Sequence, residues 1–313
     1  MESENKTMTE LTPKRRMTEG GIAFSVAIVL YMGVSLIFQL IASAIGGKGV
    51  GDADWYKYLA FLLPQLCFAG AALLFFRRTK VSPRRMYTPC KWWYFFIALA
   101  LQFGLLFSLG ELNGLFLKGL ERIGYTAADA SVTDSMVAGW YLLPAILIIA
   151  LLPALFEETL VRGILLGGMR ENSWGSAACI LVSGAMFSLF HCNPEQTIYQ
   201  FICGACYALL ALRSGSVFPT MLAHFANNAL VLILTAAGVS SFSALPTGAY
   251  LSLVIVSALC LVGVLVYLLV FERRKNVKGG VHEGKAFFFS SAVGIAVCAI
   301  VWLVTLVTGF LHG

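Results

Sequence analysis

The chain has 313 residues, of which 59% are hydrophobic and only 12% are charged. Soluble globular domains carry about 25% charged residues, so this composition excludes an ordinary soluble domain. The net charge of +6 comes from a few clusters between apolar segments, and we therefore connect it with membrane topology and expect no nucleic-acid partner.

Apolar stretches of about 20 residues recur along the chain, and each is long enough to cross a bilayer as an α-helix. We expect an all-α, polytopic transmembrane bundle with a polar cavity inside it. Eight or nine spans are predicted, at residues 22–46, 58–76, 93–117, 139–169, 174–191, 197–212, 217–237, 249–271 and 286–310. Residues 1–20 are polar, and we expect them to form a disordered tail before a single transmembrane domain at 21–313.

Basic residues gather in three segments, which fall on one side of the membrane if every span crosses once. They are Lys6, Lys14, Arg15, Arg16, Arg77, Arg78, Lys80, Arg84, Arg85, Lys91, Arg273, Arg274, Lys275, Lys278 and Lys285. Cytoplasmic loops of membrane proteins are enriched in Lys and Arg. We therefore expect an integral membrane protein with a cytoplasmic N-terminus, and the short loops favour a bacterial cell membrane.

Ionisable residues inside the apolar segments are the most informative positions, because each is costly in a bilayer and normally faces a cavity or a partner. In the fourth segment, Glu158 and Arg162 are four residues apart and can pair on one helix face. Glu157 is rotated from Glu158 by about 100° and points elsewhere. One carboxylate can thus be neutralised while the other stays available for chemistry.

Further polar groups follow in later segments. Counting the helical rise from the basic side places Glu157 roughly 20 Å deep, His191 roughly 28 Å, His224 roughly 15 Å and Asn228 roughly 20 Å. We expect these four side chains to meet in one intramembrane cavity that opens more readily toward the cytoplasm. Pro153 precedes Glu157 by one turn and can kink the helix or open a carbonyl, although packing explains it equally well.

These residue types suit hydrolysis of a peptide bond without a covalent nucleophile. A buried carboxylate beside a histidine can hold and deprotonate a water molecule. A second histidine with an amide can donate hydrogen bonds to a carbonyl oxygen as it becomes an oxyanion. Zinc is the alternative, with Glu157, His191 and His224 as ligands, but the chain has no HExxH motif. Water activation without a metal or another cofactor is slightly favoured.

Three short motifs follow one another in this region. The stretch "EETLVR" at 157–162 fits EExxxR, "FSLFH" at 187–191 fits FxxxH, and "HFANN" at 224–228 fits HxxxN. In this order they resemble the signature of the CPBP family, which comprises CAAX prenyl endopeptidases of the Ras-converting type, bacteriocin-processing proteases and Abi proteins. The resemblance covers residues 140–237, which would be the catalytic core.

The resemblance implies an intramembrane endopeptidase that cuts a membrane-associated protein or peptide, with or without a lipid group. The implied roles are activation of water for Glu157 and His191, the oxyanion site for His224 and Asn228, and structural support for Glu158, Arg162 and Phe187. Members of this family have been described both as metalloproteases and as metal-independent glutamate-type proteases. The resemblance therefore leaves the zinc question open.

Other interpretations keep the helices but change the role of the polar groups. The main alternative is a catalytically silent, protease-like immunity or scaffold protein that binds a peptide in the cavity. Interhelical hydrogen bonds, worth on the order of 1 kcal/mol each, would also explain buried polar side chains. A proton-coupled transporter is a further alternative, but the sequence shows no inverted repeat or paired half-helices that would support it.

Overall fold

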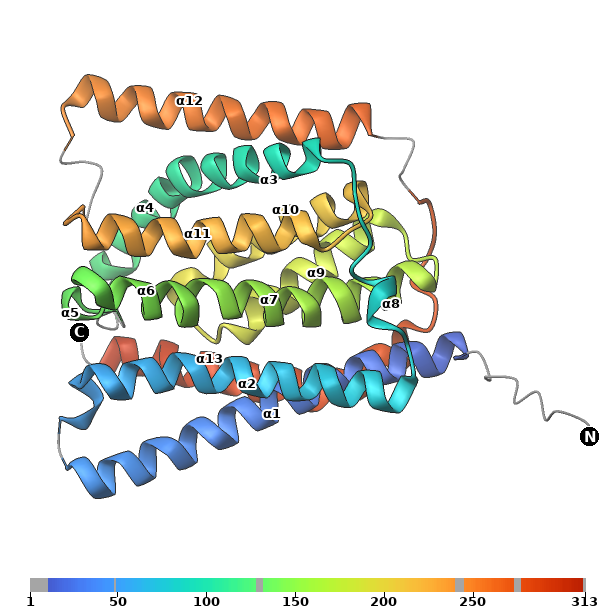
Figure 1. Ribbon diagram of the computed structural model, residues 1–313, viewed down its shortest axis with the longest axis horizontal. Coiled ribbons are helices and arrows are strands. Elements are labelled where there is room, and N and C mark those ends of the chain that lie inside the picture. Colours follow the sequence, from blue (N-terminus) through green and yellow to red (C-terminus); the bar gives the residue numbers. More distant parts are fainter. Residues whose placement is uncertain (1–10, 48, 128–131, 240–244, 273–276, 312–313) are drawn as a thin grey trace, which may run out of the picture.

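The computed structural model describes residues 11–47, 49–127, 132–239, 245–272 and 277–311. Every regular element within these ranges is helical, and none of the described residues forms a strand. Figure 1 shows long helices that lie side by side with their axes nearly aligned. The predicted all-α fold is confirmed.

The chain begins with two long helices and a broken third one. These elements are α1 (Pro13–Gly46), η1 (Val50–Asp52), α2 (Asp54–Thr79), η2 (Pro83–Arg85), α3 (Trp93–Gly104), the π-helical η3 (Leu105–Leu109) and α4 (Gly110–Arg122). A nearly continuous helical rod follows the short α5 (Asp134–Val137). Its parts are η4 (Gly139–Tyr141), α6 (Leu142–Ala145), η5 (Ile146–Leu151), α7 (Leu152–Glu158), η6 (Thr159–Leu166) and α8 (Gly167–Glu171).

The second half of the chain adds five helices to this rod. They are α9 (Ser176–Phe190), α10 (Thr197–Ser214), α11 (Phe218–Ala236), α12 (Thr247–Val266) and α13 (Gly284–Leu311), with η7 (Pro194–Gln196) before α10 and the π-helical η9 (Tyr267–Phe271) after α12. Seven helices of the described chain are long and apolar enough to cross a membrane. The predicted spans at 174–191 and 197–212 are α9, a shorter apolar helix of 15 residues, and α10, which is not among the seven.

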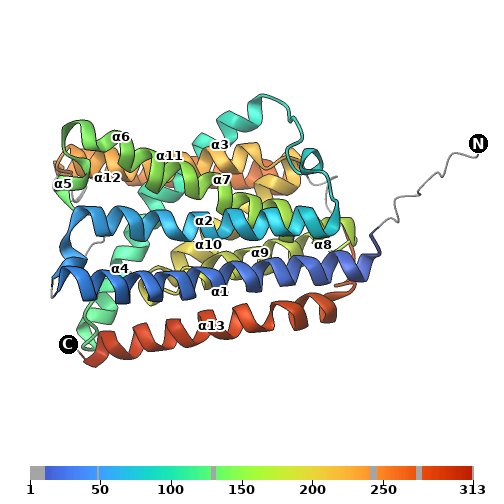
Figure 2. The ribbon, with the colours of Figure 1, turned by 60° about the horizontal axis from the view of Figure 1, so that its bottom comes forward.

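The helices are arranged around the rod that contains α7. Figures 1 and 2 show α12 and α13 on opposite outer faces of the bundle. Helix α1 packs along α13 and α2, α3 packs between α11 and α12, and α9 packs along α10. The rod contacts α2, α9, α10 and α11 and so lies in the interior. On the outer faces, large apolar side chains such as Phe289 and Leu259 are 88% and 67% exposed, as expected for surfaces that meet lipid.

The N-terminal tail is shorter than predicted. Residues 1–10 lie outside the described residues, but α1 already begins at Pro13, so the prediction of disorder is wrong for 13–20. Arg16 is buried and its Nε lies 2.7 Å from a carboxylate oxygen of Glu171, while Glu19 is buried and lies 2.8 Å from Nε of Arg78. These ion pairs between helices compensate the charges and allow α1 to extend toward the basic end of the bundle.

Candidate active site

The rod carries two π-helical segments, η5 and η6, on either side of α7. Such wide turns are frequent at functional sites. Pro153 has no N–H to donate to the carbonyl of Ile149 four residues earlier. That carbonyl instead accepts a hydrogen bond of 3.0 Å from Nδ2 of Asn228 on α11. The carbonyl that Pro153 leaves without its helical donor is therefore bound by the Asn228 amide of the third motif.

Glu158 faces α10 and α11 and lies at the centre of a charged group. Its Oε1 atom is 2.8 Å from Nη1 of Arg162, and both side chains are fully buried. The same oxygen lies 3.1 Å from Nδ1 of His224. Nη2 of Arg162 donates to the carbonyl of Gly204 at 2.9 Å. The ion pair predicted from the four-residue spacing is confirmed, and it also links α7 to α10 and α11.

The aromatic ring of Phe187 contacts three of the polar side chains of the site. The guanidinium of Arg162 lies 4.3 Å from the centre of this ring, a cation–π contact. The rings of His191 and His224 lie 4.9 and 5.8 Å from it. Helix α10 approaches closely here, since a Cβ atom on Gly204 would lie 2.9 Å from Cβ of Phe187. Only glycine at this position lets the helices come near enough for Arg162 to reach the α10 backbone.

Glu157 points away from this charged group, toward α2. Its Oε1 atom accepts a hydrogen bond of 2.9 Å from Nε2 of Gln65. Its Oε2 atom lies 3.9 Å from Nε2 of His224 and has no hydrogen-bond partner among the residues that the structure describes. The side chain is only 7% exposed. The predicted rotation between the two carboxylates thus gives Glu157 one anchored oxygen and one available oxygen.

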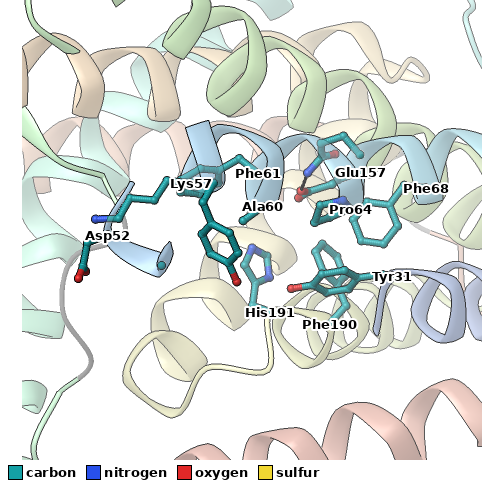
Figure 3. A pocket seen from close by; sticks show the side chains of 13 residues that line it. Tyr31, Asp52, Lys57, Ala60, Phe61, Pro64, Phe68, Glu157, Phe190 and His191 are labelled. Atoms are coloured by element: carbon teal, nitrogen blue, oxygen red, sulfur yellow. Dashed lines mark hydrogen bonds between the residues drawn. The ribbon is translucent and has the colours of Figure 1, made fainter. Parts of the chain in front are cut away.

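His191 follows the end of α9, and its tautomer can be deduced from its surroundings. Nδ1 lies 2.7 Å from the carbonyl oxygen of Phe187, which can only accept, so Nδ1 carries the hydrogen. In the neutral ring the lone pair is then on Nε2. Figure 3 shows His191 and Glu157 on the wall of one cavity, with Asp52 and Lys57 at its far end.

Two cavities meet at Glu157 and His191. The first, of about 470 Å³, is also lined by His224 and Asn228. The second, of about 500 Å³, runs between α1 and α2 and is mostly apolar. Both are lined by Phe61, Gln65, Glu157 and His191. The predicted convergence of Glu157, His191, His224 and Asn228 on one cavity is confirmed, and Glu158 and Arg162 line neither cavity.

The prediction that the cavity opens toward the basic end is wrong. Lining residues such as Asp52, Lys57 and Gln196 lie at or beside the loops of the opposite end, and no basic-end loop contributes to either lining. The depth count already placed His191 almost a full membrane thickness from the basic loops. A separate cavity of about 480 Å³, lined by Arg85, Arg162 and Glu171 among others, lies at the basic end, and it shares no lining residue with these two.

A second polar group supports Asn228 and was missed from the sequence. Nε2 of Gln102 donates to Oδ1 of Asn227 at 2.6 Å, and Oε1 of Gln102 accepts from the hydroxyl of Tyr207. Nδ2 of Asn227 donates to Oδ1 of Asn228 at 2.8 Å. With the bond to Ile149, these contacts fix the orientation of the Asn228 amide. Gln65, Gln102 and Asn227 are uncharged and occupy no defined position of the three motifs, so the sequence pattern does not distinguish them.

A zinc site at this position would require Glu157, His191 and His224 to converge as ligands. The described part of the chain contains no group of three or more His, Cys, Asp or Glu side chains placed to hold a metal ion. Of the three candidate zinc ligands, Glu157 has one oxygen bound to Gln65 and one without a hydrogen-bond partner among the described residues, and His191 and His224 each have Nδ1 bound to an acceptor.

Comparison with known protein families identifies the central part of the chain. The profile described as "Type II CAAX prenyl endopeptidase Rce1-like" matches residues 139–230, less than a third of the chain. This segment is Rce1-like. The match begins at the start of the rod and ends within α11, so the Rce1-like segment contains all three motifs. It confirms the resemblance drawn from them.

The Rce1-like segment does not include α1, α2, α3, α12 or α13. Neither a curated protein nor a solved structure matches the chain. At the level of the family, the match supports a hydrolase of the CAAX-protease type. Helix α2, which supplies Gln65, contributes to the site from outside the matched segment.

Proposed function

We propose that this protein is an intramembrane endopeptidase that hydrolyses a peptide bond of a membrane-associated protein or peptide with a water molecule activated by Glu157. The observation that carries the proposal is the position of the Glu157 carboxylate. One oxygen is held by Gln65, the other has no hydrogen-bond partner among the described residues, and the side chain lines a cavity together with His191, His224 and Asn228. The Rce1-like match over the same residues supports this assignment.

In the first step, Glu157 and His191 act on the water. Oε2 of Glu157 takes one proton, and Nε2 of His191 accepts a hydrogen bond from the other. The water oxygen attacks the carbonyl carbon of the scissile bond, and the carbonyl oxygen becomes an oxyanion. When this intermediate collapses, the C–N bond breaks and the proton on Glu157 passes to the leaving nitrogen. No covalent enzyme intermediate is needed.

The oxyanion is assigned to His224 and Asn228. One N–H of the Asn228 amide is bound to the Ile149 carbonyl, so the other N–H is the available donor. Nδ1 of His224 gives its hydrogen to Glu158, so donation from Nε2 requires the doubly protonated ring. In that form, Glu157, Glu158, Arg162 and His224 together have no net charge. This balance suits a group of charges removed from water.

The test of the proposed function compares the membrane proteome of cells that carry the wild type with that of cells carrying Glu157→Gln. We expect new N-termini of membrane-associated proteins or peptides only with the wild type. Their sequences would define the substrate and show whether it is lipidated. Identical N-termini in both cells, combined with a normal cellular phenotype of the variant, would overturn the proposal and favour a scaffold or immunity protein.

We further propose that hydrolysis proceeds without a metal ion. Support comes from the positions of Glu157, His191 and His224, which do not form a ligand group. Activity of the purified protein should therefore persist after exhaustive chelation, with no stoichiometric zinc by elemental analysis. Loss of activity that returns on addition of zinc would contradict this part of the proposal.

The basic clusters lead us to propose that the N-terminus is cytoplasmic and that the mouth of the cavity near Asp52 and Lys57 faces the other side of the membrane. A single cysteine introduced at Lys57 in a cysteine-free background should react with a membrane-impermeant maleimide added to intact cells. Labelling only after the cells are opened would reverse the orientation.

A further inference from the structure

Helix α2 places an amide at the point where the two cavities meet, although it lies outside the Rce1-like segment. Gln65 is only 5% exposed, and it lines both cavities together with Glu157 and His191. A buried amide in an apolar helix is costly unless it forms hydrogen bonds. The burial of the Gln65 amide at this position therefore indicates a functional role.

The two ends of the Gln65 amide have different surroundings. Nε2 donates to Oε1 of Glu157 at 2.9 Å, a charge-assisted bond when the carboxylate is ionised. Oε1 of Gln65 is buried and has no hydrogen-bond partner within the described part of the chain. Buried acceptors in proteins are normally satisfied. Because Gln65 lines the cavities, the donor for this oxygen can come from a molecule that enters them.

The neighbouring turn of α2 offers a second acceptor to the same cavity. Pro64 lies inside the helix and has no N–H to donate to the carbonyl of Ala60. Ala60, Pro64 and Gln65 all line the apolar cavity, and Figure 3 shows Ala60 and Pro64 on its wall. An internal proline weakens a helix by about 3 kcal/mol in soluble hosts. This face of α2 therefore combines a freed carbonyl with an unpaired amide oxygen, and both suit the N–H groups of an extended peptide.

We propose that Gln65 is a positioning residue of the hydrolytic site: its amide N–H holds one oxygen of Glu157 so that the other faces the water, and its amide oxygen accepts a hydrogen bond from a peptide N–H of the substrate. This inference rests on the proposed function. It assigns to α2 both a catalytic support and a part of the peptide-binding surface, opposite the His224 and Asn228 side of the cavity.

Two substitutions separate these contributions. Gln65→Met keeps the length of the side chain but removes donor and acceptor. It should lower kcat by about 10- to 100-fold, as is typical when a partner that orients a reactive group is lost. It should also raise KM, because the peptide loses an acceptor. The substrate in this assay is a synthetic peptide that copies the sequence around a bond whose cleavage depends on Glu157.

Gln65→Glu gives a readout that a purely structural role would not move. The new side chain keeps an acceptor oxygen, but it has a hydrogen to donate to Glu157 only when it is protonated. The activity of this variant relative to the wild type should therefore rise as the pH is lowered, whereas the ratio for Gln65→Met should stay constant. If Gln65→Met does not fold, this pH-dependent ratio still decides the question.

Gln39→Met serves as the matched control, because it makes the same exchange at an exposed position of α1 and should leave kcat and KM unchanged. Wild-type kcat in a folded Gln65→Met variant, or a Gln65→Glu ratio that does not change with pH, would overturn the inference. If Glu157→Gln abolishes cleavage in the same assay, either result refutes only the proposed role of Gln65 and leaves the proposed function intact. If Glu157→Gln remains active, the proposed function itself is wrong.

Discussion

The adjacent carboxylates Glu157 and Glu158 have contrasting surroundings on the two sides of α7. On the side toward α10 and α11, Glu158 forms a buried ion pair with Arg162 and binds His224. On the side toward α2, Glu157 accepts a hydrogen bond from the uncharged amide of Gln65 and lines two cavities. The comparison teaches that buried charge can serve two purposes in one helical turn. A carboxylate bound by a guanidinium holds helices together, whereas one held by an amide keeps its basicity available.

The largest expected effect is on the α2 side. Glu157→Gln keeps the shape of the side chain and can still accept the hydrogen bond from Gln65, but it cannot take a proton from water. We expect kcat to fall by about 10²- to 10⁴-fold, the usual range for loss of a general base. Thermal stability in detergent should change little. If the variant keeps most of its activity, Glu157 is not the general base, and the proposed difference in role between Glu157 and Glu158 is wrong.

On the other side of α7, the expected effect is on stability. Glu158→Gln leaves the buried guanidinium of Arg162 without its counter-charge. Breaking a buried ion pair in this way typically costs about 3–5 kcal/mol. The fraction of protein that survives heating in detergent, measured by size-exclusion chromatography, should fall sharply.

Adding Arg162→Met to Glu158→Gln should recover much of this loss, because no unpaired charge then remains. The double variant is the control for the single one. If Glu158→Gln is as stable as the wild type, the ion pair does not have the structural role that the comparison gives it.

A substitution of Asn228 tests the proposed oxyanion site. Asn228→Ala removes a donor whose orientation is fixed by Ile149 and Asn227. Loss of one such donor lowers kcat by about 10²-fold or more in enzymes that stabilise an oxyanion. We expect kcat to fall while KM changes little, as measured with the cleaved peptide sequence. An equal rise in KM with unchanged kcat would instead assign Asn228 to substrate binding.

The smallest of these effects concerns the contact between α9 and α10. Gly204→Ala would place a methyl group 2.9 Å from Cβ of Phe187 and so push apart the helices that Arg162 bridges. Overpacking of this kind costs about 1–3 kcal/mol. Gly70→Ala on α2, where no atom lies within 4 Å of an added Cβ, is the matched control and should not lower the melting temperature.

Much of this comparison could be predicted from the sequence, because it depends on local geometry. The four-residue spacing of Glu158 and Arg162 predicts their pairing, and the offset of Glu157 predicts its separate orientation. The wide turns of η6 leave this pairing intact. Apolar segments of sufficient length likewise predict the helices of the bundle, apart from the early start of α1.

Other parts depend on which helices become neighbours, which the spacing of residues along one helix does not encode. Gln65 is separated from Glu157 by 92 positions, so its role could not be predicted from a motif. The same holds for Gln102 and Asn227. The predicted direction of the cavity is wrong because the residues that line its mouth, such as Asp52 and Gln196, come from segments far from the motifs in the sequence.

The central claim is direct attack of a water molecule on the peptide bond, with Glu157 as the base. The most direct test is a single-turnover cleavage of the identified peptide in ¹⁸O-labelled water containing hydroxylamine, followed by mass spectrometry of the new C-terminus. The account predicts that the new carboxyl group carries one ¹⁸O atom and that no hydroxamate forms. A peptide hydroxamate would reveal a covalent acyl-enzyme and would contradict it.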